Sequence, residues 1–156
     1  MLKKTALAVA IAAFAVGAVA QDKRPGYGNP VTVAQAKKIA AGAIAECQKN
    51  GWNVATAIVD PHGTLVYYEK MEDTQYASAD IAIGKARAAA TYRRPTRAFA
   101  DAINKGSPAT ATLPGVFASP GGVPLMVDGK VIGAVGSSGV TGDQDEQCSM
   151  AGARSM

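Results

Sequence analysis

The one histidine of the sequence limits the catalytic chemistry that is open to this chain. His62 is the only histidine in 156 residues, which excludes a zinc site built from several histidines. A serine–histidine–acid triad would have to recruit His62 from a turn. Ser137 and Ser138 stand within Gly-Ser-Ser-Gly, which lacks the G-x-S-x-G spacing of the serine hydrolase elbow. The sequence therefore argues against both kinds of hydrolytic site.

Three carboxylates near the C-terminus, Asp143, Asp145 and Glu146, resemble a cluster that could hold iron. They follow Thr141, which stands three residues before Gln144 in the spacing of a capping box. Negative side chains in the first turn of a helix are also stabilised by the helix dipole. The cluster is therefore interpreted either as an iron site or as charge that stabilises the start of a helix.

Basic side chains concentrate in one stretch of the middle of the chain. Its members are Lys85, Arg87, Arg93, Arg94, Arg97 and Lys105. In that stretch only Asp101 opposes them, which favours a site for an anionic small ligand, and the alternative is a solvated helix face. The whole chain carries a formal net charge of only +4, which is too small an excess to indicate a nucleic acid or an anionic membrane as partner.

Two cysteines, Cys47 and Cys148, are the only candidates for a disulfide. Cys47 lies on the apolar stripe of a predicted helix, and Cys148 lies in the predicted C-terminal helix, so the two sulfurs could meet if those helices pack side by side. The alternative is a pair of buried free thiols. Neither cysteine has a neighbour at metal-ligand spacing, which argues against a metal site.

The first 20 residues have the pattern of a cleavable signal peptide. Lys3 and Lys4 precede a short, alanine-rich apolar run, and the segment 18–20 reads Ala-Val-Ala, which fits the A-x-A cleavage rule. We expect export to the periplasm or the medium, a flexible Gly- and Pro-containing lead-in at residues 21–30, and one domain at residues 31–156. No second apolar run of spanning length follows, so an integral membrane protein is not expected.

The hydrophobic pattern predicts helices at both ends of the domain and in its middle. A capping box at Thr32 and Gln35 precedes an apolar stripe of helical period that ends at Asn50-Gly51. Helical patterns recur at residues 79–91 and 96–104, and the last helix follows the capping box at Thr141.

Strand patterns lie between these helices. Residues 52–60 and 65–69 flank a Pro-His-Gly turn, and residues 123–127 and 130–136 flank Asp128-Gly129, which suits a two-residue hairpin turn. The long irregular segment 106–122 is of the kind that often lines a site. This order predicts an α+β domain with a single antiparallel sheet and helices packed on it.

Several motifs in the same order give the domain a family resemblance. The motifs are Val59-Asp60-Pro61-His62-Gly63-Thr64-Leu65, Asp80-Ile81-Ala82 with Lys85-Ala86, Arg94-Pro95-Thr96, Gly121-Gly122-Val123-Pro124, Gly133-Ala134-Val135-Gly136, Ser138-Gly139 and Gln144-Asp145-Glu146. From residue 31 to about 153 the chain resembles the GlcG/HbpS-type family, also described as a DUF336-like domain. The resemblance implies a profilin-like fold, self-assembly into homo-oligomers, and an association with haem binding and haem degradation in some members.

Noncovalent haem needs an axial donor, an apolar wall and cations near the propionates. His62 is the best donor by type, and Lys85 and Arg87 are candidates to meet the propionates. The donors ranked behind His62 are Met71, Tyr67, Tyr68, Tyr76 and Tyr92. On this interpretation the protein is an exported haem-binding protein that assists oxidative haem breakdown, with Asp143, Asp145 and Glu146 collecting the released iron.

Two other functions fit the same residues. One is a small-molecule carrier or enzyme with a pocket near Lys85, to which the candidate lining residues Gly121, Gly122, Ser138 and Gly139 also belong. The other is a redox-responsive module that reports to a membrane sensor protein, with Cys47 and Cys148 as the switch.

Overall fold

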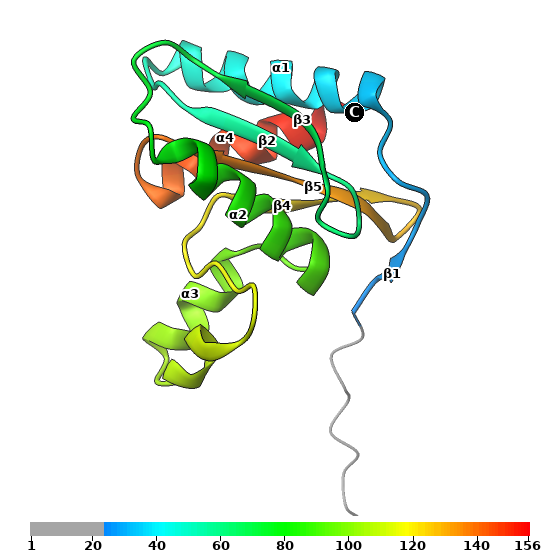
Figure 1. The fold of residues 1–156 in the computed structure, drawn as a ribbon, viewed down its shortest axis with the longest axis vertical. Coiled ribbons are helices and arrows are strands. Elements are labelled where there is room, and N and C mark those ends of the chain that lie inside the picture. The colour runs from blue at the N-terminus through cyan, green and yellow to red at the C-terminus, as the bar shows by residue number, and fades with distance from the viewer. Residues whose placement is uncertain (1–23) are drawn as a thin grey trace, which may run out of the picture.

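The computed structural model describes residues 24–156, and the signal peptide expected at residues 1–20 lies outside this part of the chain. Figure 1 shows helices packed on a single sheet. The elements in chain order are β1 (Gly26–Tyr27), α1 (Val33–Lys49), β2 (Ala55–Val59), β3 (Leu65–Lys70), α2 (Ser78–Tyr92), α3 (Arg97–Asn104), the 3-10 helix η1 (Pro108–Thr112), β4 (Gly122–Val127), β5 (Lys130–Ser138) and α4 (Gly142–Arg154).

Strand β5 is the centre of the sheet. It pairs antiparallel with β2 and with β4, and β3 pairs antiparallel with the free edge of β2. These pairings confirm both predicted hairpins. The short β1 adds a parallel pair to the start of β5, with Tyr27 opposite Val131, so part of the expected lead-in contributes to the sheet.

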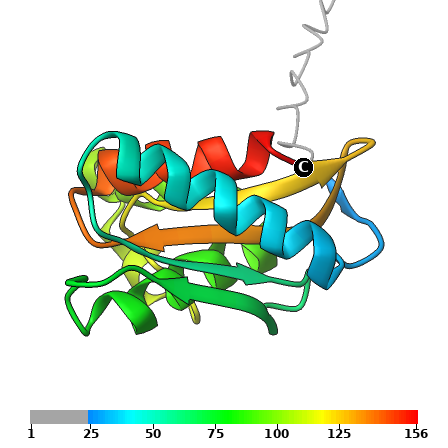
Figure 2. The ribbon, with the colours of Figure 1, turned by 90° about the horizontal axis from the view of Figure 1, so that it is seen from above.

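Helices cover both faces of the sheet, as Figure 2 shows from above. On one face, Ile39 and Ala40 of α1 share a core with Ile58 and Val135 of the strands, and α4 lies beside α1. On the other face α2 packs almost only with alanines, whose small side chains let the helix lie close to β2 and β5. Every residue of β2 is buried, because both of its faces are covered.

The predicted start and turn signals are confirmed. Thr32 with Gln35 and Thr141 with Gln144 each form a complete capping box, at the starts of α1 and α4. Asp128, with φ of 49°, and Gly129, with φ of 71°, turn β4 into β5.

Between α2 and β4 the chain leaves the sheet and builds the part that lies below α2 in Figure 1, which contains α3 and η1. Phe99 of α3 packs edge-on against Tyr92, with ring centroids 5.2 Å apart. The Tyr92 hydroxyl donates to the carbonyl of Pro114 over 2.6 Å. These contacts hold the segment at residues 113–115 beside the C-terminal end of α2.

Candidate functional site

His62 lies at the tip of a tight turn between β2 and β3. The Asp60 carboxylate accepts hydrogen bonds from the backbone N–H groups of His62, at 2.8 Å, and of Thr64, at 2.9 Å. The Gly63 amide donates to the Asp60 carbonyl, which closes the turn. The turn is therefore well fixed, while the His62 side chain is exposed and its imidazole makes no hydrogen bond within residues 24–156.

Arg87 of α2 joins the helix to this turn. Its Nε donates to the Gly63 carbonyl over 3.0 Å, and a Cβ at Gly63 would stand 3.3 Å from the Arg87 side chain. Among residues 24–156, Arg87 forms no ion pair with a carboxylate, so its exposed positive charge is not neutralised there. A guanidinium in this setting can pair with an anionic group of a ligand.

The turn and α2 border an open hollow of about 540 Å³. Its lining residues are His62, Gly63, Arg87, Thr91, Tyr92, Pro114 and Gly115. They come from three stretches of chain: the turn, the C-terminal half of α2, and the segment held by the Tyr92 hydrogen bond. The volume lies in the range of small-ligand sites in proteins. We call this hollow the His62 site.

A second hollow of about 310 Å³ adjoins the His62 site, and His62 and Thr91 line both. Its other lining residues are Tyr27, Gly28, Pro30 and Pro61. Prolines and an aromatic ring make this side largely apolar. The imidazole of His62 thus stands between a cationic hollow and an apolar one, an arrangement suited to a ligand that is apolar with acidic groups on one edge.

Met71, one of the donors placed behind His62, is far from this site along the hairpin. It follows the last residue of β3, whereas His62 precedes the first, so the two residues stand at opposite ends of the strand. The Met71 sulfur accepts from the Val54 amide and packs beside Cys47 and Cys148. The structure therefore does not bring Met71 to the His62 site.

Lys85 belongs to the interior, which corrects its prediction as a ligand-binding residue. The side chain is 1% exposed, and its ammonium lies 2.7 Å from the Asp145 carboxylate and donates to the Ser137 carbonyl over 3.2 Å. A Cβ at Gly121 would stand 2.8 Å from Lys85 Nζ, and one at Gly122 would collide with the Lys85 carbonyl. The two glycines make room for the lysine, and the expected pocket near Lys85 is filled.

Burial raises the pKa of the Asp145 carboxyl above its ordinary value, and the Lys85 ammonium acts in the opposite direction. The backbone amide of Val140 also donates to this carboxylate, over 3.2 Å. Lys85 thus supplies the positive partner of a buried carboxylate, which is a structural role.

Ser138 and Gly139 also serve packing. Ser138 is 3% exposed and pairs with Ala55 at the end of β5. A Cβ at Gly139 would collide with the carbonyl of Asn53, so the glycine allows two backbones to approach closely. Neither residue lines the His62 site or the apolar hollow beside it.

The three C-terminal carboxylates do not gather around a common point, which corrects the interpretation as an iron site. Asp145 faces Lys85, whereas Asp143 and Glu146 each form an ion pair with Arg97 of α3. Within residues 24–156, no three or more His, Cys, Asp and Glu residues gather in a group that could hold a metal ion. The two outer carboxylates instead tie α4 to α3.

Cys47 and Cys148 form a disulfide that joins α1 to α4, with their Cα atoms 5.6 Å apart. Both cysteines are fully buried, together with Ile44 and Val54. Of the two alternatives that the sequence left open, the structure therefore has the disulfide. Its burial shields the bond from thiols in solution, which does not favour a freely accessible redox switch.

Sequence reasoning missed part of the walls of the His62 site. The sequence indicated the segment 106–122, which contains Pro114, as a lining segment and Tyr92 as a haem donor, but it did not indicate Tyr27 or Thr91 as site residues. Tyr27 and Pro114 lie in the lead-in and in the irregular loop, far from His62 in the sequence.

Among residues 24–156, no helix has the length and apolar character needed to cross a lipid bilayer.

Comparison with known proteins gives relatives for almost the whole domain. Protein GlcG of Escherichia coli strain K12 is 43% identical over 103 residues, which are 66% of this chain and 77% of GlcG. A double mutant of HbpS from Streptomyces reticuli superposes with a TM-score of 0.76 at 29% identity, over 95% of this chain and 97% of HbpS.

A structure described as a PduOC:heme complex has the same fold, with a TM-score of 0.74 at 24% identity over 81% of this chain and 95% of PduOC. The family model described as "Haem degrading protein HbpS-like" matches residues 31–154. The match extends from the residue before the first capping box to the last residue of α4, and the chain therefore belongs to the HbpS-like family.

Proposed function

We propose that this protein binds haem at the His62 site. The observation that carries the proposal is the placement of an exposed imidazole, without a hydrogen-bond partner in the described chain, beside the un-neutralised guanidinium of Arg87 and an apolar hollow. An imidazole is a common axial ligand of haem iron, and a guanidinium pairs well with a propionate. The family description and the heme complex of a protein with the same fold support the same ligand.

Each residue of the site would have a separate role in binding haem. His62 would donate a ring nitrogen to the iron from a turn that Asp60 holds in place. Arg87 would hold a propionate while its Nε stays on the Gly63 carbonyl. Pro61 and Tyr92 would exclude water from the two sides of the ring system. Bound haem would supply iron that can react with peroxide.

The binding test is a hemin titration of protein purified from cells that express the full chain, followed at the Soret band. We expect a saturable shift for the wild type. His62→Ala should abolish the shift or displace the band, and Arg87→Gln should weaken binding about tenfold, because a charge-assisted pair is lost. Met71→Leu is the matched control and should bind like the wild type, because Met71 lies at the other end of the hairpin. Absence of a saturable shift in the wild type, or an unchanged titration of His62→Ala, contradicts haem binding at this site.

Oxidative haem degradation is the further part of the proposal that the family description supports. Peroxide added to the complex should bleach the Soret band faster than it bleaches free hemin at the same concentration. Equal rates with and without protein would exclude a catalytic role and leave haem binding alone.

Export and self-assembly complete the proposal. The basic residues, the apolar run and the Ala-Val-Ala of residues 1–20 support cleavage and a periplasmic or secreted location. Intact mass of the purified protein should correspond to a chain that begins at Gln21. Gel filtration with light scattering should give a homo-oligomer, and a monomer at all concentrations would contradict self-assembly.

A further inference from the structure

The first described residues form a strap across the end of the sheet. We use strap for residues Arg24–Pro30, which contain β1. The Gly28 amide donates to the Val131 carbonyl over 2.9 Å, and the Val31 amide just behind the strap donates to Ile132 over 2.8 Å. These bonds fix the strap to the start of β5.

Tyr27 fastens the strap to α2. Its hydroxyl donates to the Thr91 carbonyl over 2.8 Å. The Arg93 guanidinium lies over the Tyr27 ring, 5.1 Å from its centroid, and also donates to the Pro25 carbonyl over 3.0 Å. The strap therefore binds the same end of α2 that carries the walls of the His62 site.

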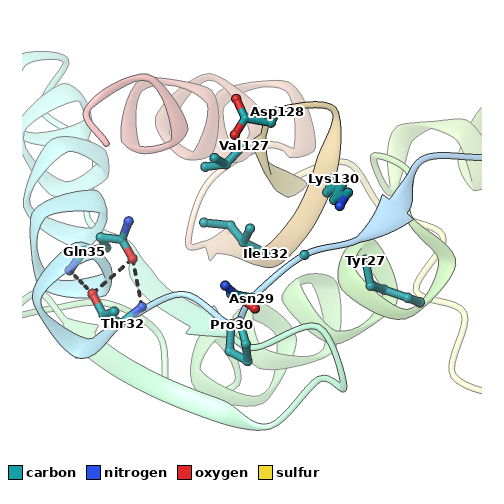
Figure 3. A pocket seen from close by; sticks show the side chains of 10 residues that line it. Tyr27, Asn29, Pro30, Thr32, Gln35, Val127, Asp128, Lys130 and Ile132 are labelled. Atoms are coloured by element: carbon teal, nitrogen blue, oxygen red, sulfur yellow. Dashed lines mark hydrogen bonds between the residues drawn. The ribbon is translucent and has the colours of Figure 1, made fainter.

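The strap separates two hollows. Tyr27, Gly28 and Pro30 line the apolar hollow beside His62, and they also line a hollow of about 550 Å³ on the other side. Figure 3 shows this other hollow between the strap, the start of α1 and the turn after β4, with the Tyr27 side chain extending away from Val127. The strap is thus a wall of the His62 site that is supplied by a separate piece of chain.

We propose that Tyr27 is a ligand-contacting residue of the His62 site and that docking of the strap is coupled to haem binding. This inference rests on the proposed function. Tyr27 is 47% exposed, although its hydroxyl is hydrogen-bonded and its ring lies against the Arg93 guanidinium, so it offers apolar surface beside His62 at little cost in conformational entropy. A flat apolar ligand that reaches from Arg87 past His62 would cover this ring.

The coupling has a direction that follows from the architecture. A two-residue strand at a sheet end has fewer backbone hydrogen bonds than the central strands, so the strap opens more readily than the core. If the ligand contacts the docked strap, the docked form binds more tightly, and by linkage the ligand stabilises the docked strap by the same factor. Binding should therefore slow the opening of the strap.

The first experiment compares hemin affinities of three variants. Tyr27→Ala should weaken binding about tenfold, because the ring and its anchor are lost. Tyr27→Phe keeps the ring and should stay within about threefold of the wild type. Asn29→Ala is the matched control, since Asn29 lines only the hollow of Figure 3, and its affinity should not change. An unchanged affinity of Tyr27→Ala overturns the inference.

The second experiment uses amide hydrogen exchange of the wild type, which needs no variant and so is not affected by misfolding. Hemin should slow exchange at the Gly28 and Val31 amides by about the same factor by which loss of the docked strap weakens binding. Exchange at the Trp52 amide, bonded to the Cys47 carbonyl at the far end of α1, should not change. Unaltered exchange in the strap overturns the coupling. Wild-type binding that needs His62 but not Tyr27 contradicts this inference alone, whereas no wild-type binding contradicts the proposed function as well.

Discussion

The buried ion pair of Lys85 and Asp145 gives the sharpest test of how this fold is stabilised. Lys85→Met keeps most of the length and volume of the side chain but removes the charge. Asp145 is then a carboxylate with a side chain 3% exposed and no cation beside it. Loss of one partner of a buried pair typically costs about 3–5 kcal/mol, because the other charge is left uncompensated.

The structure sets a limit on this cost. The remaining carboxyl can lose its charge by taking up a proton. For a carboxyl with the ordinary pKa of 3.8, protonation costs about 1.4 kcal/mol for each pH unit above that pKa, or roughly 4.4 kcal/mol at pH 7. Burial already raises the pKa of Asp145 in the wild type, so part of this cost is present before the substitution. We therefore expect Lys85→Met to lower the free energy of unfolding at pH 7 by about 2–4 kcal/mol.

The pH dependence follows from the sign of the pKa change. In Lys85→Met the folded pKa of Asp145 rises further above its unfolded value, so the folded state holds an extra proton between these two pKa values. The stability of the variant is then greatest below the unfolded pKa and falls as the pH rises through the folded one. The difference from the wild type should be small near pH 4 and should grow toward pH 7.

Chemical denaturation across this pH range is the assay, with Lys37→Met on the exposed face of α1 as the matched control. The control should stay within about 0.5 kcal/mol of the wild type at each pH. Lys85→Met combined with Asp145→Asn removes both charges, so it should be more stable than Lys85→Met at pH 7 and should lose the pH dependence. A Lys85→Met protein within about 1 kcal/mol of the wild type, or a loss of stability that is the same at every pH, would refute the electrostatic reasoning.

Two further predictions concern the packing of the helices. Cys47→Ala with Cys148→Ala opens a loop with a sequence separation of 101 and should lower the free energy of unfolding by up to about 4–5 kcal/mol. Adding reductant under denaturing conditions should reproduce this loss in the wild type. An equal denaturation midpoint with and without the disulfide would contradict the prediction. Gly136→Ala should destabilise the fold by more than about 2 kcal/mol, since the new Cβ collides with the Ala82 carbonyl of α2. Its control in thermal melts is Gly26→Ala, where a Cβ meets nothing within 4 Å, and equal melting of the two variants would refute the packing argument.

Local sequence signals predicted the local structure well. The capping boxes at Thr32 and Thr141 gave the starts of both outer helices, because a cap is a contact between residues three apart. The Asp128-Gly129 turn was equally readable, since positive φ angles suit few other residues. Each of these signals is complete within a few neighbouring residues.

The role of Lys85 could not be predicted from its neighbours because its partner is not local. Asp145 stands 60 residues later in the sequence, and no residue near Lys85 indicates that the two side chains pair. One signal was present: Lys85 lies three residues after Ala82 and four before Ala89, so it shares the stripe of α2 that faces the sheet. A lysine within an alanine stripe indicates a buried cation that needs a carboxylate.

The assembly of the His62 site could not be predicted for a similar reason. The sequence indicated the segment 106–122 as a lining segment, but the walls come from the strap, the turn, the end of α2 and the segment around Pro114, and only the tertiary fold brings these together. Sequence types could select His62 and Arg87 as a donor and a cation, and the structure places both at one hollow. The residue type alone could not distinguish Arg87, which faces solvent, from Lys85, which lies two residues earlier and is buried.

The two ends of the β2–β3 hairpin have different roles, one in the proposed ligand site and the other in the packing around the disulfide. At its closed end the turn presents His62, and at its open end Met71 packs beside the disulfide, about 20 Å away at the usual rise of a six-residue strand. His62 and Met71 of one chain are therefore too far apart to hold the same haem iron. Lys85 of α2 faces the interior and does not line the His62 site, whereas Arg87 two residues later does, so the contacts of Lys85 stabilise the fold without touching the ligand. A folded Lys85→Met protein should therefore bind hemin like the wild type even though it unfolds more easily.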